Sequence, residues 1–221
     1  YTGAAGQTAP TADQLNAIAG GAGVTADNLA AVQAAVAAAN ADADGKPVTQ
    51  AELQAIIKAI SDAAAGIGQF AQDNSTGLAN ATGTAPVTGD YTKAGVTGVT
   101  TGNVAAINDV LASKAVDGAA ADTPAEIQAI VDAYNKVLAA ADGTDGNAAA
   151  APSAADYSAI GVAGTTDASA KLLSDMVDGL AATAVDTVAE LQALADAAKA
   201  AVDYTGAAGQ TAPTADQLNA I

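Results

Sequence analysis

The sequence of 221 residues contains no cysteine, no histidine, no arginine and no tryptophan. Without cysteine there is no disulfide framework and no thiol chemistry. Without histidine, histidine-based triads and histidine general bases are excluded. All seven cationic side chains are lysines, and none stands in the Gly-Lys-Ser or Gly-Lys-Thr ending of a phosphate-binding loop. We therefore expect a protein that is not an enzyme, with no catalytic and no cofactor-binding residues.

Aromatic residues make up only 3% of the chain. Because Phe, Tyr and Trp each bury about 150–250 Å², a large layered core is disfavoured, and small helical cores of Ala, Val, Ile and Leu are expected. The 24 acidic residues give a formal net charge of −17. This charge argues against nucleic acid as a partner, since phosphate contacts need clustered cations. No run approaches the roughly 18 strongly apolar residues of a membrane span, so we expect no membrane insertion in this window.

The dominant feature that the sequence does contain is repetition. Residues 204–221 repeat residues 1–18 letter for letter, as YTGAAGQTAPTADQLNAI, so the sequence begins again after 203 residues. Self-similarity at a fixed period is typical of arrays whose units contact mainly their neighbours. We therefore expect neighbouring repeats of the same chain to be partners of this segment.

Within the long repeat an Ala-Pro dipeptide recurs, and each copy opens a similar run. The prolines are Pro10, Pro86, Pro152 and Pro213. A large residue stands five positions after each of them: Leu15, Tyr91, Tyr157 and Leu218. A short apolar turn and glycines follow, which predicts a short helix with a glycine stop. Because Tyr91 and Tyr157 replace Leu15, we expect both to pack in a core with the hydroxyl at its rim, and a ligand-stacking role is disfavoured.

Two further helices are predicted in each run. One begins at Thr25, Thr100 or Thr166, and apolar residues recur behind it at helical spacing. The next begins at a capping box, in which a threonine caps a backbone N–H and a glutamate three positions later reaches back. The boxes are Thr49 with Glu52, Thr123 with Glu126 and Thr187 with Glu190, and they hold the only glutamates of the chain. Three helices with three apolar faces predict a small bundle.

The expected fold is all-α, a linear array of tandem small three-helix bundles. The expected parts are a connector from the preceding repeat at 1–9, three modules at 10–85, 86–151 and 152–212, and the start of the next repeat at 213–221. Long connectors are expected at 63–85 and 141–151. For residues 66–89 the sequence does not decide between an irregular loop and a short strand at 87–91. The alternative fold for the chain is an antiparallel β-sandwich array.

The order of these motifs resembles a known family over most of each unit. The order is Ala-Ile-Gly, as at 159–161, then a threonine-led helix, as at 99–112, and then Thr-Pro-Ala-Glu-Ile-Gln-Ala-Ile, as at 123–130. This order resembles the albumin-binding GA-type three-helix module of bacterial surface proteins. It is also similar to the helical repeats of giant bacterial adhesins, which carry phrases close to AELQAIVDA. The resemblance implies a three-helix fold and an extracellular place on the cell surface. No albumin-contacting residues of the GA family can be matched to positions here.

Calcium is the one open question of metal binding. Asp42-Ala43-Asp44-Gly45, followed by Thr49 and Glu52, imitates the exit of an EF-hand loop, but the glycine is misplaced and the loop is one residue short. A capping role for Glu52 is therefore favoured. The stretch 142–147, Asp-Gly-Thr-Asp-Gly-Asn, is rich in oxygen ligands and in turn formers, so it is either a calcium turn or a flexible polar turn. We assign no metal ligand and no cofactor, with calcium left open.

The sequence favours a non-enzymatic structural repeat segment of a long extracellular bacterial surface protein, forming a stalk, filament or adhesin shaft. The first alternative is a GA-like module that binds a host surface protein through one helical face. The second is a subunit of a self-assembling sheath or fibre, in which lateral contacts between chains dominate.

Overall fold

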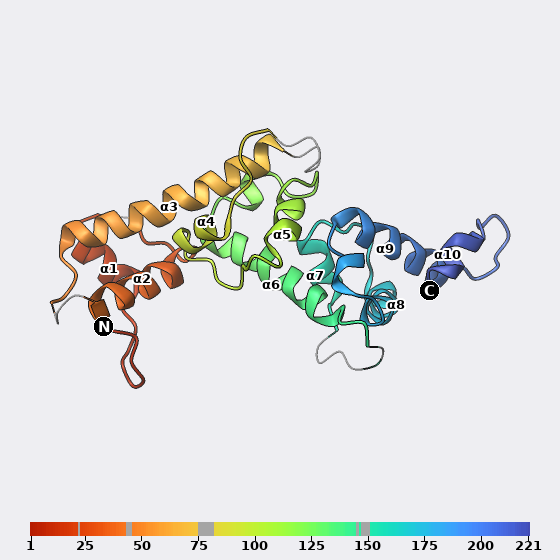
Figure 1. Cartoon of the computed structure of the whole chain (residues 1–221), viewed down its shortest axis with the longest axis horizontal. Coiled ribbons are helices and arrows are strands. Elements are labelled where there is room, and N and C mark those ends of the chain that lie inside the picture. The colour runs from red at the N-terminus through yellow and green to blue at the C-terminus, as the bar shows by residue number, and fades with distance from the viewer. Residues whose placement is uncertain (22, 43–45, 75–81, 145, 147–150) are drawn as a thin grey trace.

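The computed structural model describes residues 1–221 except 22, 43–45, 75–81, 145 and 147–150. The described residues form ten α-helices and two short 3₁₀ helices, and among them there is no strand, only an isolated bridge between Asp142 and Ala181. This confirms the all-α prediction, and the β-sandwich alternative is wrong for this part of the chain. The molecule is elongated, and the helices follow one another along its long axis (Figure 1).

For description we divide the first nine α-helices, in chain order, into three units, each with a first, a second and a third helix. Unit 1 has α1 (Ala12–Ala19), α2 (Leu29–Asp42) and α3 (Gln50–Asp73); unit 2 has α4 (Thr88–Lys93), α5 (Val104–Leu111) and α6 (Pro124–Ala140); unit 3 has α7 (Ala154–Ala159), α8 (Asp167–Asp178) and α9 (Val188–Asp203). The 3₁₀ helices η2 (Gly118–Ala120) and η3 (Ala182–Ala184) precede α6 and α9, and α10 (Ala215–Asn219) closes the chain. We call α1, α4, α7 and α10 first helices, and α3, α6 and α9 third helices.

The three predicted capping boxes begin the three third helices. At α3 the Thr49 hydroxyl accepts a hydrogen bond from the Glu52 amide at 3.3 Å, and the Glu52 carboxylate accepts one from the Thr49 amide at 2.7 Å. The same pair of bonds opens α6 and α9. Hydrogen bonds from Thr49 hold the pKa of Glu52 below its ordinary value. The glycine stop is also confirmed, since Gly20 ends α1 with φ of 74°.

The structure corrects the prediction for 63–89 in two places. α3 runs to Asp73, so residues 63–73 are helix and not connector. The reason is that buried residues continue at helical spacing through Ala64, Ile67 and Ala71. Residues 88–93 form α4, so a strand at 87–91 is wrong. The Asp90 carboxylate accepts a hydrogen bond from the Val87 amide at 3.0 Å, which satisfies a free N–H at this helix start.

Buried apolar side chains form two clusters. The first lies in unit 1 and consists of Leu15, Ala19, Val24, Ala31, Val32, Val36, Leu53, Ile57 and Ile60. The second extends from Ala64 in α3 to Ala198 in α9 and includes side chains of units 2 and 3. The helix α3 therefore contributes its N-terminal half to one cluster and its C-terminal half to the other.

Candidate functional site

The same polar contact secures the proline at the start of each unit. A side chain of the second helix donates to the proline carbonyl oxygen in all three units: Gln33 Nε2 to Pro10 at 2.7 Å, Asn108 Nδ2 to Pro86 at 2.8 Å and Ser174 Oγ to Pro152 at 2.8 Å. Buried amide or hydroxyl groups need such partners. Three different residue types thus bind the proline carbonyl in the three units. Because the residue types differ, the sequence does not show that these three positions correspond.

The tyrosines that replace Leu15 join this contact. Tyr91 and Tyr157 are fully buried, which confirms the prediction of core packing. Their hydroxyl groups, however, do not lie at the rim of the core. The Tyr91 hydroxyl donates to Asn108 Oδ1 at 2.6 Å, and the Tyr157 hydroxyl lies 3.2 Å from Ser174 Oγ, both in buried positions. Burial raises the pKa of Tyr157 to about 12 and raises that of Tyr91 further.

A glutamine in each third helix bonds to the last residue of the first helix of the same unit or to the loop after it. Gln54 Nε2 donates to the Ala19 carbonyl oxygen at 2.6 Å. Gln128 bonds to both backbone groups of Thr97, at 2.8 and 3.1 Å, and Gln192 bonds in the same way to Ala163. Each unit therefore closes on itself through residues about 30 positions apart.

Contacts between units also recur. The third helix of each unit packs against the first helix of the next, as α3 with α4, α6 with α7 and α9 with α10. Lys136 of α6 forms an ion pair with Asp156 of α7 at 2.6 Å. Backbone groups join the units as well, because the Ala125 amide donates to the Asp27 carbonyl oxygen at 3.0 Å and the Val188 amide donates to Asp109 Oδ2 at 2.7 Å.

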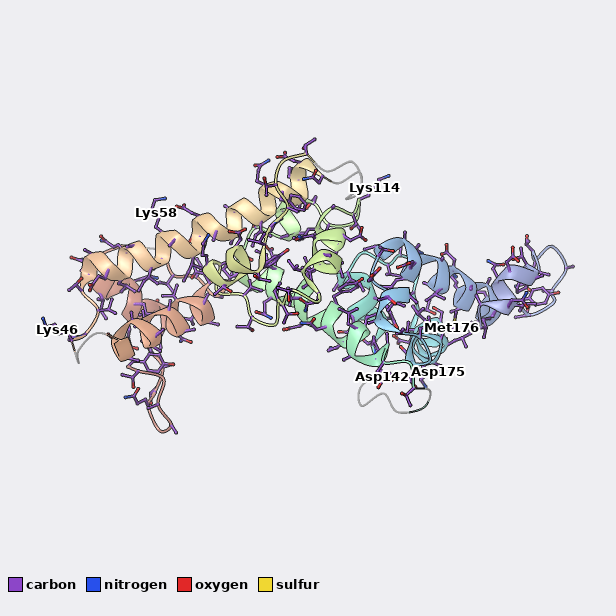
Figure 2. All side chains as sticks on the ribbon, in the orientation of Figure 1. Lys46, Lys58, Lys114, Asp142, Asp175 and Met176 are labelled. Carbon is purple, nitrogen blue, oxygen red and sulfur yellow. The ribbon has the colours of Figure 1, made fainter. Side chains whose placement is uncertain are left out.

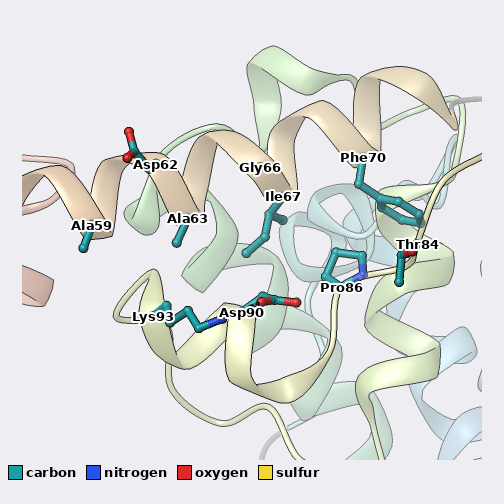
Figure 3. Close-up of a pocket in the computed structure, with 10 residues that line it drawn as sticks. All are labelled: Ala59, Asp62, Ala63, Gly66, Ile67, Phe70, Thr84, Pro86, Asp90 and Lys93. Carbon is teal, nitrogen blue, oxygen red and sulfur yellow. Dashed lines mark hydrogen bonds and ion pairs between the residues drawn. The ribbon is translucent and has the colours of Figure 1, made fainter.

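One of the hollows at these junctions is a groove between α3 and α4. Its volume is about 440 Å³, and Figure 3 shows the residues that line it, among them Ile67, Phe70 and Pro86. Its charged side chains already have partners within the chain: Asp90 pairs with Lys93 at 3.2 Å, and Asp62 pairs with Lys58 at 2.5 Å. The groove therefore has the character of a packing seam between units.

Two pairs of carboxylates lie at the starts of α6 and α9. Partial desolvation and the neighbouring Glu126 raise the pKa of Asp122, and partial desolvation and Glu190 raise that of Asp186 in the same way. Paired carboxylates can serve glycoside hydrolysis when a substrate lies between them. Here both glutamates accept the amide hydrogen bond of a capping threonine, so each pair belongs to a helix start.

The first candidate calcium stretch falls partly outside the described residues, at 43–45. Its last member, Glu52, is bonded to Thr49 as the cap of α3. In the second stretch, Asp145 and Asn147 lie outside the described residues, while Asp142 Oδ1 accepts a hydrogen bond from the Thr144 amide at 2.8 Å. Across the described positions, no group of three acidic, histidine or cysteine side chains is placed to hold a metal ion.

The second stretch contacts a buried carboxylate that the sequence did not point to. Asp178, at the end of α8, is 5% exposed, and its Oδ2 accepts a hydrogen bond from the Gly146 amide. Its Oδ1 is buried and has no hydrogen-bond partner among the described residues. Asp142 bridges to Ala181, just after this helix, and the exposed Asp175 lies on α8 one turn before Asp178 (Figure 2). The equivalent position of unit 2 holds the fully buried Ala112.

Asp178→Asn is expected to stabilise the protein in a chelating buffer by about 1 kcal/mol, or about 2–4 °C in Tm, because it removes a poorly paired buried charge. Thermal unfolding followed by circular dichroism measures the change. Asp175→Asn, on the same helix but exposed, is the matched control and is expected to stay within about 0.5 kcal/mol. Calcium tests the open alternative, because a bound ion raises the wild-type Tm and makes Asp178→Asn destabilising.

Within the described residues, no helix combines the length and the apolar character needed to cross a bilayer. Comparison with known proteins found no matching family model, no matching curated protein and no matching solved structure.

Proposed function

We propose that this chain is a structural segment of a long extracellular bacterial surface protein and does no catalysis. In this proposal, units 1 to 3 are tandem three-helix bundles, joined end to end as one repeat of a stalk, filament or adhesin shaft. The sequence resemblance to GA-type modules and to adhesin repeats supports the bacterial surface as its location.

The observation that carries the proposal is the recurrence of the same internal bonds. The proline carbonyl contact and the glutamine contact of the third helix recur in units 1, 2 and 3. Equivalent bonds at equivalent places favour three copies of one structural plan. The letter-for-letter restart at residue 204 extends that plan beyond a single repeat.

The contacts between units suit a load-bearing shaft. Each third helix packs against the next first helix, so the chain advances along one axis instead of folding back on itself (Figure 1). Small units bury modest cores and gain stability from their neighbours. The net charge of −17 keeps parallel chains apart in solution.

Limited proteolysis of a protein with several consecutive repeats tests the proposal. We expect cleavage to fall between units and to give a ladder of fragments that differ by whole units, with spacings of 61 to 76 residues between the prolines. The same protein in denaturant is the control, and it should be cut throughout. Uniform cleavage within the helices of the folded protein would contradict the proposal. Capture of a serum protein by one repeat would instead favour the GA-like binding module.

A further inference from the structure

The first helices α4 and α7 each face the third helix of the preceding unit with residues at the same places in the repeat. In α4 these positions are Asp90 and Lys93, which line the groove against α3. In α7 the position of Asp90 is taken by Asp156, which pairs with Lys136 of α6. One side of a first helix therefore contacts the preceding unit. The residue after Asp90 or Asp156, which is Tyr91 or Tyr157, is instead buried in the core of its own unit.

The last first helix follows the same rule. In α10 the two positions are Gln217 and Ala220, which line a groove of about 380 Å³ against Ala193, Leu194 and Ala197 of α9. Gln217 is half-buried there, whereas Leu218, the residue that would serve its own unit's core, is 55% exposed.

In the identical sequence at the other end of the chain, the leucine is the buried residue and the glutamine is the exposed one. In α1, Leu15 is 2% exposed and packs in the cluster of unit 1. The residues that correspond to Asp216, Gln217 and Ala220 are Asp13, Gln14 and Ala17, and all three are exposed. The two copies of one segment therefore use two faces that do not overlap, and a single copy can make both sets of contacts at once.

We propose that the exposed face of α1, formed by Asp13, Gln14 and Ala17, is a docking surface for the third helix α9 of a second copy of this repeat. The inference rests on the proposed function, because the second copy is the repeat that precedes this one in the array. Successive 203-residue repeats are then joined by the same helix-on-helix contact that joins the units within one repeat.

The size of the surface determines which copy can occupy it. A few small side chains bury too little area to hold two free chains together. A covalent neighbour has an effective concentration in the millimolar range, so the same contact forms within one polymer. The alanines at 17, 193 and 197 place only small side chains between the two helices. Free chains therefore stay monomeric, and α1 docks where a preceding repeat is attached.

The full chain already carries one such contact, between α9 and α10, and this allows a direct test. A helix of five residues is not stable alone, so the helical carbon chemical shifts of residues 215–219 report docking. Ala193→Glu places a carboxylate in the groove beside Glu190 and Asp216. We expect the helical shifts to fall below about half of their wild-type values. Because Ala193 is exposed, the substitution leaves the core of unit 3 intact.

Ala189→Glu is the matched control, because Ala189 is exposed on the same helix and does not line the groove. It should leave the shifts of 215–219 unchanged. Two results would overturn the docking surface but leave the array proposal standing. One is equal chemical shifts of 215–219 in the two variants. The other is a wild-type chain in which α1 to α9 are helical and α10 is not. Loss of the helices in units 1 to 3 of the wild-type chain would instead overturn the array itself.

A chain lengthened by a second repeat tests the α1 face in its natural setting. In the lengthened chain the segment of α10 becomes the first helix of a complete unit, so its docking on α9 is held more firmly. We expect the Tm of units 2 and 3 of the first repeat to rise by about 2 °C or more over the single repeat. Ala193→Glu in the first repeat should remove the gain, and Ala189→Glu should keep it. An equal Tm for the two lengthened variants would contradict the docking surface.

Discussion

Replacing Gly95 by alanine is expected to lower the free energy of unfolding by about 2–5 kcal/mol, one of the two largest effects predicted for this chain. Two costs add. Gly95 has φ of 76°, a conformation that costs a residue with a Cβ about 1–2 kcal/mol. The new Cβ would also lie 2.3 Å from the Cβ of Ala31 in α2, and relieving such overpacking costs about 1–3 kcal/mol. Gly95 belongs to unit 2 and Ala31 to unit 1, so the substitution disrupts the contact between these two units.

Gly83→Ala separates the two costs. Gly83 has φ of 81°, but its Cβ would meet none of the described atoms within 4 Å, so only the conformational cost of about 1–2 kcal/mol remains. Denaturant unfolding followed by circular dichroism gives both values. Adding Ala31→Gly to Gly95→Ala removes the 2.3 Å contact between the two Cβ atoms and should restore part of the loss. Equal destabilisation by the two glycine substitutions would mean that the junction at Ala31 is loose.

The local features of this fold could be predicted from sequence, because their causes lie within a few residues. The boxes at Thr49, Thr123 and Thr187 are read from two residues three positions apart, and each begins a helix as expected. The core positions of Tyr91 and Tyr157 followed from their replacement of Leu15 at one place in the repeat. Periodicity and capping are local physics, and the sequence carries them directly.

The extension of α3 was missed because glycines commonly mark helix ends. Gly66 and Gly68 stand inside α3. At Gly68 a Cβ would lie 2.9 Å from the Asp122 Cα atom, so this glycine permits close approach to the chain before α6. That requirement comes from a segment more than fifty residues away. A glycine that ends a helix and a glycine that lets another chain segment approach look alike in a single sequence.

The contacts between units could not be predicted for a related reason. The Val188 amide donates a hydrogen bond to Asp109, 79 positions away, and the sequence around either residue does not indicate this contact. The proline contact uses glutamine, asparagine and serine for one task, so no shared residue type marks it. The docking face of α1 is an exposed surface whose partner is recognised only because α10 repeats its sequence and packs on α9.

Leu53→Ala and Ile127→Ala are expected to separate two steps of unfolding. Leu53 is 2% exposed in the unit 1 cluster, and Ile127 is fully buried in the cluster that spans units 2 and 3. Truncating a buried leucine or isoleucine to alanine costs about 2–5 kcal/mol. Because the unit 1 cluster is small, Leu53→Ala should lower the Tm of its transition by at least about 10 °C. Calorimetry should show the second transition almost unchanged.

Ile127→Ala should act on the other transition and shift units 2 and 3 together, since their buried residues form one cluster. The shift per kcal/mol is smaller here, about 2–4 °C, because more residues unfold at once. The helix α3 decides how far the steps stay separate: its residues beyond Ile60 pack with unit 2, so they can remain folded after the unit 1 cluster has opened. A single transition that both variants lower equally would mean that α3 transmits unfolding through its whole length. In the proposed shaft, separate steps would let unit 1 unfold first under load and lengthen the chain while units 2 and 3 stay folded.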